Sequence, residues 1–118
     1  MADSSDFDTV LDLCRDEHRR IVLAVLAEEQ RSVTVTDLTK VILKYIHQKP
    51  ITEASERVLT QIQLSLHHVH IPKLESARVI EYDPEHKHVE PAVQFDQLQP
   101  SLRAILDADP SLEQPVEL

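Results

Sequence analysis

The chain has 118 residues, which is enough for one domain with a modest core. Its 12 basic and 21 acidic residues give a formal net charge of −9, which by itself argues against a nucleic-acid partner. The sequence has no apolar run near the ~18 residues of a membrane span and no basic-then-apolar leader, so we expect a cytoplasmic protein without membrane contact. Its single cysteine cannot form an internal disulfide.

The charges are segregated along the chain. Residues 1–30 carry 3 basic and 8 acidic side chains and residues 91–118 carry 1 and 5, whereas residues 31–80 carry 7 and 4. The middle of the chain is therefore mildly basic between two acidic ends. A carboxylate surplus with few lysines is typical of proteins adapted to a salt-rich cytoplasm, and the simplest interpretation of the acidity is solubility alone.

Two helices are predicted at the acidic N-terminal end. The first is short and amphipathic, with the apolar residues Phe7, Val10, Leu11 and Cys14. The second begins at Asp16 or Glu17 and has an apolar stripe of Ile21, Val22, Val25 and Leu26. Three arginines are expected outside this stripe: Arg15, Arg19 and Arg20.

A short strand and a third helix follow. Val33 and Val35 alternate as a strand, and Thr36 is the predicted N-cap of a helix that runs to about His47. The apolar face of this helix holds Leu38, Val41, Ile42 and Tyr45. We expect Pro50 to close it.

A long helix is predicted next, from about Ala54, with Thr52 as its cap. Its inward face is the series Leu59, Ile62, Leu66, Val69, Leu74 and Ala77. Pro72 disturbs this helix because it lacks the amide that would bond the carbonyl of His68 and collides with that turn. Two alternatives remain: a kink at Pro72, which we favour, or a stop near His70 and a restart with Pro72 as the first residue.

The long helix runs into a predicted β-hairpin. Val79 to Tyr82 forms one strand, Asp83 to His86 a turn with Pro84 at its second position, and His88 to Glu90 the returning strand. A helix followed by such a hairpin is the closing half of a winged helix-turn-helix. The predicted fold is therefore α+β and mostly helical, with a winged helix-turn-helix domain over residues 6–91, a two- or three-stranded wing sheet and flanking N- and C-terminal helices.

The C-terminal end is predicted to be a helix and a tail. The helix covers residues 92–109, has Pro100 in its first turn and presents Phe95, Leu98, Leu102, Ile105 and Leu106 on one face. Residues 110–118 are predicted to form a mobile acidic tail. The chain has no glycine, which excludes glycine-rich phosphate-binding loops and means that other residues make every turn.

One run of the sequence is distinctive: Leu66-His67-His68-Val69-His70-Ile71-Pro72-Lys73-Leu74, followed by Val79-Ile80-Glu81-Tyr82-Asp83. With Asp16, His18, Arg19 and Arg20 before an apolar helix, and with Thr36-Asp37-Leu38, it resembles a family of haloarchaeal winged-helix domains without an assigned activity, over about residues 8–91. The long helix is more distantly similar to the recognition helix of ArsR-type repressors. The chain departs from that wider pattern at Arg78, where many relatives place a glycine. The resemblance implies a winged-helix fold, a salt-adapted cell and a role in transcription regulation, and it implies no ligand.

The long helix, about residues 54–70, and the wing, residues 79–90, are the predicted interface with double-stranded DNA. With the apolar face turned inward, glutamines can read adenine in the major groove, and serine or histidine can donate to bases or phosphates. The candidate DNA-binding residues are Arg57, Thr60, Gln61, Gln63, Ser65, His67, His68, Lys73 and Lys87. The alternative is a polar face without DNA contact, as in a protein–protein interaction module on the same fold.

The histidines offer a further alternative, a metal site at His67, His70, His86 and His88. The spacing lacks the cysteines of a strong zinc signature, so we favour no metal and expect His70 to be a hydrogen-bonded core residue between helix and wing. We also expect no cofactor, no small-molecule ligand and no enzyme activity, because the sequence shows no nucleophile on a strained turn and no glycine-lined oxyanion hole.

The two end segments bear on the oligomeric state. Each is amphipathic, so they can pair across a two-fold axis and match paired DNA half-sites. We therefore expect a homodimer. The alternative is that these segments only cover their own core.

Overall fold

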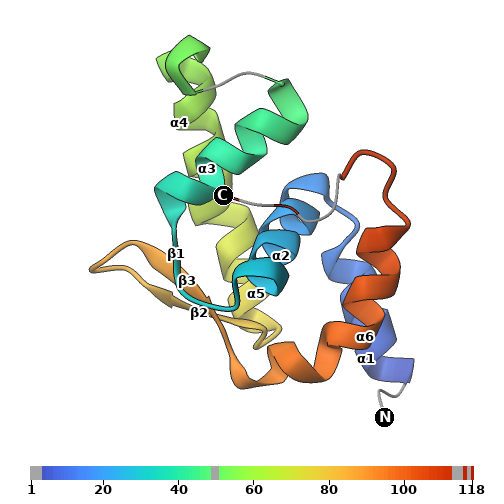
Figure 1. The fold of residues 1–118 in the computed structure, drawn as a ribbon. Helices are drawn as coiled ribbons and strands as arrows, with labels where there is room; N and C mark the ends of the chain where they lie inside the picture. Colours follow the sequence, from blue (N-terminus) through green and yellow to red (C-terminus); the bar gives the residue numbers. More distant parts are fainter. Residues whose placement is uncertain (1–3, 49–50, 113–115, 117) are drawn as a thin grey trace.

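The computed structural model describes residues 4–48, 51–112, 116 and 118 of the chain. Its architecture is a mostly helical α+β fold that combines helices with a three-stranded antiparallel sheet of order β1-β3-β2 (Figure 1). This arrangement is compatible with a winged-helix layout, which confirms the predicted fold class. No helix within the described residues has the length and apolarity needed to cross a membrane.

Three helices build one end of the molecule. α6 (Val93–Asp107) packs against α1 (Ser4–Leu13) and α2 (Glu17–Glu29) (Figure 1). α2 begins at Glu17, one of the two predicted starts. Asp16 is its N-cap, and its Oδ1 accepts the backbone N–H groups of His18 and Arg19 at 2.8 and 3.3 Å.

One expectation for this end is wrong. α1 turns Val10 and Leu13 into the core and leaves Phe7 and Leu11, two apolar residues of the predicted amphipathic segment, each 43% exposed. Arg19, expected outside the apolar stripe, is buried with an exposed fraction of 8%. A buried arginine needs hydrogen-bond partners, so its contacts define part of the site described below.

β1 (Val33–Thr34) is followed at once by α3 (Val35–Ile42). Thr34, not Thr36, is the N-cap, since its Oγ1 accepts the backbone N–H of Asp37 at 3.0 Å. The helix continues through a π-helical turn, η1 (Leu43–His47), to its predicted end. Three of its predicted apolar residues are buried: Leu38, Val41 and Ile42.

The long helix consists of three consecutive pieces. They are α4 (Glu56–Ser65), the π-helical turn η3 (Leu66–His70) and α5 (Ile71–Ser76), preceded by the 3-10 turn η2 (Ile51–Glu53). Ser55 is the N-cap, because its Oγ accepts the backbone N–H of Val58 at 3.2 Å. The helix therefore starts after the predicted Ala54, and Thr52 is not its cap. The role expected of Pro50 falls outside the described residues.

η3 is the way in which the helix accommodates Pro72. The backbone N–H of Ile71 bonds the carbonyl of Leu66, five residues earlier, and His70 and Ile71 keep right-handed helical angles. In a wide turn the missing amide of Pro72 and its bulky ring disturb the preceding carbonyls less than in an α-helix. The helix therefore does not stop near His70, which was the second alternative. The disturbance that we expected at Pro72 takes the form of a wide turn just before this residue.

The wide turn also changes which side chains face inward. Ile62, Leu66 and Leu74 are buried as predicted, but Val69 is 51% exposed and His70, at 3%, takes the inward position. A π-helical turn contains more residues than an α-helical one, so the residue four positions after Leu66 faces inward rather than the residue three positions after it. The inward placement predicted for Val69 is wrong for this reason.

The predicted wing is present as β2 (Ile80–Asp83) and β3 (His88–Pro91). The register pairs Tyr82 with Val89 and Asp83 with His88, and β1 pairs with the other edge of β3. The wing sheet therefore has three strands, the larger of the two predicted numbers.

Without glycine, other residues adopt the left-handed conformation, among them Arg78 with φ of 63°. At the end of α5, Arg78 N donates to the carbonyl of Glu75 at 2.9 Å and Val79 N to that of Leu74 at 3.3 Å. These are the two bonds of a Schellman cap, whose left-handed position favours glycine. Arg78 therefore bears a backbone strain that a glycine would not.

α6 covers the core with the face predicted for it, although Pro100 lies inside the helix rather than in its first turn. Beyond it, Leu112 and Val116 are buried. The mobile tail predicted for residues 110–118 stays a prediction, since residues 113–115 and 117 lie outside the described part of the chain.

Candidate nucleic-acid interface

One side of α4 and of the following turn η3 is a row of exposed side chains, which we call the outer face of α4. It holds Arg57, Thr60, Gln61 and Leu64 on α4 and His68 on η3. These residues recur at spacings of three or four, so they lie on one side of the helix. The inward side carries the buried Ile62. Four of the five were predicted as DNA-binding residues; Leu64, which is 51% exposed, was not.

The other predicted DNA-binding residues lie around this row. Gln63 is exposed on its flank, whereas Ser65 and His67 are half-buried. Lys73, on α5, forms an ion pair with Asp12 of α1, with 3.1 Å between Nζ and Oδ2. Lys87 is exposed at the tip of the wing and has φ of 54°.

His67 connects the long helix to the wing. Its Nδ1 lies 3.4 Å from the hydroxyl of Tyr82 on β2, and the two rings meet edge to face with centroids 5.9 Å apart. This contact holds the wing beside the helix, which is the relative placement that a winged helix needs to contact groove and backbone together.

The outer face of α4 belongs to a stretch without carboxylates. Residues 57–74 contain no Asp or Glu, although the chain has 21. Six aspartates lie in or just after α1 and α6: Asp6, Asp8, Asp12, Asp96, Asp107 and Asp109. Figure 1 shows α1 and α6 at the end of the molecule opposite α4. The uneven charge along the sequence is therefore also uneven in space.

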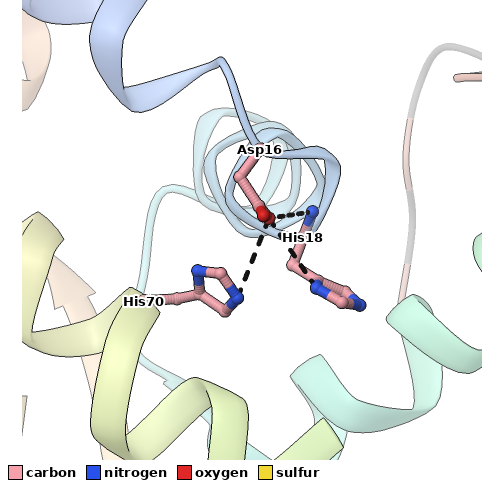
Figure 2. A group of neighbouring side chains, drawn as sticks. All are labelled: Asp16, His18 and His70. Atoms are coloured by element: carbon pink, nitrogen blue, oxygen red, sulfur yellow. Dashed lines mark hydrogen bonds and ion pairs between the residues drawn. The ribbon is translucent and has the colours of Figure 1, made fainter.

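A polar cluster joins the long helix to the start of α2 (Figure 2). His70 Nε2 and His18 Nδ1 each lie 3.7 Å from the same oxygen, Asp16 Oδ1. On the other side of its ring, His70 Nδ1 is 3.4 Å from the guanidinium of Arg19. His70 is thus a core residue, as expected, but its polar partners lie on α2 and at its N-cap rather than on the wing.

Arg19 also closes the C-terminal end of α1. Its Nε donates to the carbonyl of Leu13 at 2.8 Å, and its Nη2 donates to that of Asp12 at 3.4 Å. The last carbonyls of a helix have no partner within the helix, and a cation is favourable at that end. One buried side chain therefore links α1, α2 and the long helix.

Sequence reasoning missed the burial of Arg19, although a signal for it existed. Arg19 precedes Val22 by three residues and Leu26 by seven, which places it on the buried side of α2. Arg20 is in a similar position at the edge of this side: its Nη1 donates to the carbonyl of Cys14 at 2.6 Å, and its Nε lies 2.8 Å from Asp109 Oδ2.

The cluster determines where protons reside. Burial lowers the pKa of His70, against the opposing effect of the Asp16 carboxylate. Burial acts to raise the pKa of Asp16, but His70 and the backbone N–H groups of His18 and Arg19 outweigh it, so that pKa is lowered. Since arginine can only donate, His70 Nδ1 accepts from Arg19, and the proton of neutral His70 lies on Nε2, toward Asp16.

The single cysteine, Cys14, is buried and unreactive. Burial raises the pKa of the Cys14 thiol to about 11, so it stays protonated at neutral pH and is a poor nucleophile or metal ligand.

The tip of the wing holds a second polar cluster. His86 Nδ1 lies 2.7 Å and His88 Nε2 lies 3.6 Å from Asp83 Oδ2. The two imidazole rings stack with centroids 5.7 Å apart and an interplanar angle of 20°. The hydrogen bond from the His86 side chain is the main cause of a lowered pKa at Asp83.

The four histidines considered together as a metal site are divided among three places. His70 lies with Asp16 and His18, whereas His86 and His88 lie with Asp83; His67 packs on Tyr82. His70 and His67 separate because the π-helical turn directs one into the core and leaves the other beside β2. Within the described residues, two other groups have ligand atoms within 4.8 Å of one another: Asp16, His18 and His70, and Asp83, His86 and His88.

Comparison with known proteins gives a family but no named relative. A family model described as Domain of unknown function (DUF7344) matches residues 11–90, which is more than half of the chain. No curated protein and no solved structure matches the chain.

Proposed function

The chain belongs to the DUF7344 family, and we propose that it is a cytoplasmic, DNA-binding transcription regulator. In this proposal α4 enters the major groove and the wing lies near the sugar–phosphate backbone. The observation that carries the proposal is the outer face of α4, a row of exposed side chains in a stretch without carboxylates.

Four of the five residues of the outer face of α4 suit a direct contact with bases or phosphate. Gln61 can bond adenine with both groups of its amide, and Arg57 and His68 can donate to guanine or to phosphate. Leu64 is apolar and exposed, which suits contact with a thymine methyl group. In molar salt, counterion release contributes little affinity, so such direct contacts carry a larger share of it than in a dilute buffer.

We also propose that the working form is a homodimer. The apolar face of α6 is buried against the core of its own molecule and is not free to pair. On α1, however, Phe7 and Leu11 lie four residues apart and are each 43% exposed. Two copies joined through this side of α1 would present two α4 helices to two half-sites. Sedimentation equilibrium in molar KCl, where the aspartates of α1 repel less, tests it: we expect a wild-type dimer and a Leu11→Ser monomer, and a monomeric wild type contradicts the proposal.

DNA binding is tested by selection from a random duplex library, followed by fluorescence anisotropy at low and at molar KCl. Arg57→Ala and Arg103→Ala are a matched pair, because both arginines are exposed and both variants lose one positive charge, but Arg103 lies on α6. We expect Arg57→Ala to weaken binding about fivefold or more and to reduce the salt dependence by about one phosphate contact. Gln61→Ala should relax selectivity at one base pair by about 1–3 kcal/mol.

The results separate the proposal from its rival. Arg103→Ala should bind DNA like the wild type, because α6 lies at the far end of the molecule (Figure 1). If no selected sequence binds at either salt concentration, the regulator proposal is wrong, and a protein-interaction role on the same fold takes its place. Equal losses in Arg57→Ala and Arg103→Ala would show that binding responds to total charge and not to the outer face of α4.

A further inference from the structure

The tip of the wing brings two imidazoles and one carboxylate together on a single hairpin. The ligand atoms of Asp83, His86 and His88 all lie within 4.8 Å of one another, and two of the separations are 2.7 and 3.6 Å. A tetrahedral zinc ion with bonds of ~2.0 Å separates its ligand atoms by roughly 3.3 Å. The observed separations bracket this value, so small side-chain rotations suffice to hold such an ion.

The hairpin orients the carboxylate before any ion binds. Asp83 Oδ1 accepts the backbone N–H groups of Glu85 and His86 at 3.0 and 3.2 Å, which leaves Oδ2 directed at the two imidazoles. His88 is the cross-strand partner of Asp83 in the register of β2 and β3. Turn and register therefore fix two of the three ligands relative to each other, which lowers the entropy lost on binding.

The other cluster, at Asp16, His18 and His70, is less suited to a metal. The Arg19 guanidinium donates toward His70 Nδ1, which directs the proton of His70 to Nε2, the nitrogen that faces Asp16. A metal ion there would have to displace that proton beside a fixed positive charge. At the wing, both imidazoles face the Asp83 carboxylate, and neither has an arginine as a hydrogen-bond partner among the described residues.

We propose that Asp83 Oδ2, His86 Nδ1 and His88 Nε2 bind a divalent transition-metal ion, and that the bound ion strengthens the contact of the wing with DNA phosphate. Two imidazoles and a carboxylate suit Zn²⁺, Ni²⁺ or Cu²⁺, and the open positions of such an ion accept water or a phosphate oxygen. The second half rests on the proposed function; the first half does not.

The negative charge of the wing is the reason why a bound ion would change its contact with DNA. Residues 80–91 contain Glu81, Asp83, Glu85 and Glu90 against the single Lys87, so the hairpin by itself is negative. A negative hairpin repels phosphate, and an ion of charge +2 next to Asp83 cancels most of that charge at the tip. The metal-loaded wing is therefore the form that fits against a DNA backbone.

The metal site is tested on the full chain with Zn²⁺ alone, by isothermal titration and by the shifts that Zn²⁺ causes in backbone amide NMR signals. We expect His86→Gln and His88→Gln each to weaken Zn²⁺ binding about tenfold or more, and the shifts to cluster on residues 82–89. His18→Gln and His47→Gln are the matched controls and should bind like the wild type. Loss of binding in His18→Gln instead would move the ion to the other cluster and overturn the proposal, as would wild-type protein that binds no Zn²⁺.

The effect on DNA is tested separately, by anisotropy with and without Zn²⁺. Zn²⁺ should raise the affinity of the wild type at least about threefold and leave that of His88→Gln unchanged, since one local ion acts on about one phosphate contact. If Zn²⁺ binds at the wing and DNA affinity does not change, the second half is wrong and the metal site stands. If no DNA binds under any condition, the proposed function fails, and the titration with Zn²⁺ alone still decides the metal site.

Discussion

Replacing Arg19 by alanine tests whether one buried arginine holds three elements of this fold together. The guanidinium donates to the Leu13 carbonyl at 2.8 Å and the Asp12 carbonyl at 3.4 Å, and it lies 3.4 Å from His70 Nδ1. Leaving a buried acceptor without a partner costs about 1–3 kcal/mol, and the two longer contacts add less. With the lost packing of the aliphatic stem, we expect Arg19→Ala to lower the free energy of unfolding by about 2–4 kcal/mol.

Urea denaturation followed by circular dichroism measures this change. For a chain of this size, a loss of about 3 kcal/mol moves the midpoint down by about 1–2 M urea. Arg15→Ala is the matched control, because the Arg15 side chain is 80% exposed and its ion pair with Asp12 spans 3.7 Å in solvent; its effect should stay within about 0.5 kcal/mol. The reasoning is refuted if Arg19→Ala shifts the midpoint no more than Arg15→Ala does.

Two further predictions concern His70 and Arg78. Because burial lowers the pKa of His70 in the folded state, the unfolded chain binds its proton first, so stability should fall as the pH drops below the ordinary histidine pKa of about 6.5. His70→Gln should flatten the stability profile between about pH 7 and 5, as measured by urea midpoints, and a profile with the wild-type slope would contradict this origin. Arg78→Gly should raise the melting temperature by about 2–4 °C, since relief of about 1–2 kcal/mol of left-handed strain exceeds the added chain entropy of about 0.5–1 kcal/mol. Arg103→Gly, inside α6, should lower it instead, and a lower melting temperature for Arg78→Gly as well would show that Arg78 is not strained.

Periodicity was sufficient where the backbone follows ideal geometry. Leu38 and Ile42 lie on the buried face predicted for α3, and the β-hairpin starts within a residue of its predicted position because a proline-containing turn separates two short apolar runs. The start of α2 was also predicted correctly, since an aspartate directly before an apolar periodic run is a local signal. These features depend on neighbours in sequence alone.

Periodicity failed where the helix departs from 3.6 residues per turn. The π-helical turn η3 shifts the phase, so Val69, predicted to face inward, is exposed, and His70 takes the inward position. Pro72 indicated that the helix is disturbed, but the sequence does not determine whether a proline produces a kink, a stop or a wide turn. The cluster at Asp16 could not be predicted for a different reason, because it requires His70 to meet residues more than 50 positions away in the sequence.

The net charge of −9 argues against DNA binding only if a DNA phosphate interacts with every charge of the molecule. In a molecule of 44 × 34 × 21 Å, the acidic α1 and α6 lie at the end opposite α4 (Figure 1). At 0.1 M salt the Debye length is about 10 Å, and at 1 M it is about 3 Å, so those carboxylates are largely screened from a duplex held at α4. A phosphate at α4 interacts mainly with the local charges of the long helix and of the wing. The long helix has no carboxylate between Arg57 and Leu74. The wing is the acidic part of this local surface, so its charge, and any ion that changes it, has more influence on DNA binding than the sum over the chain.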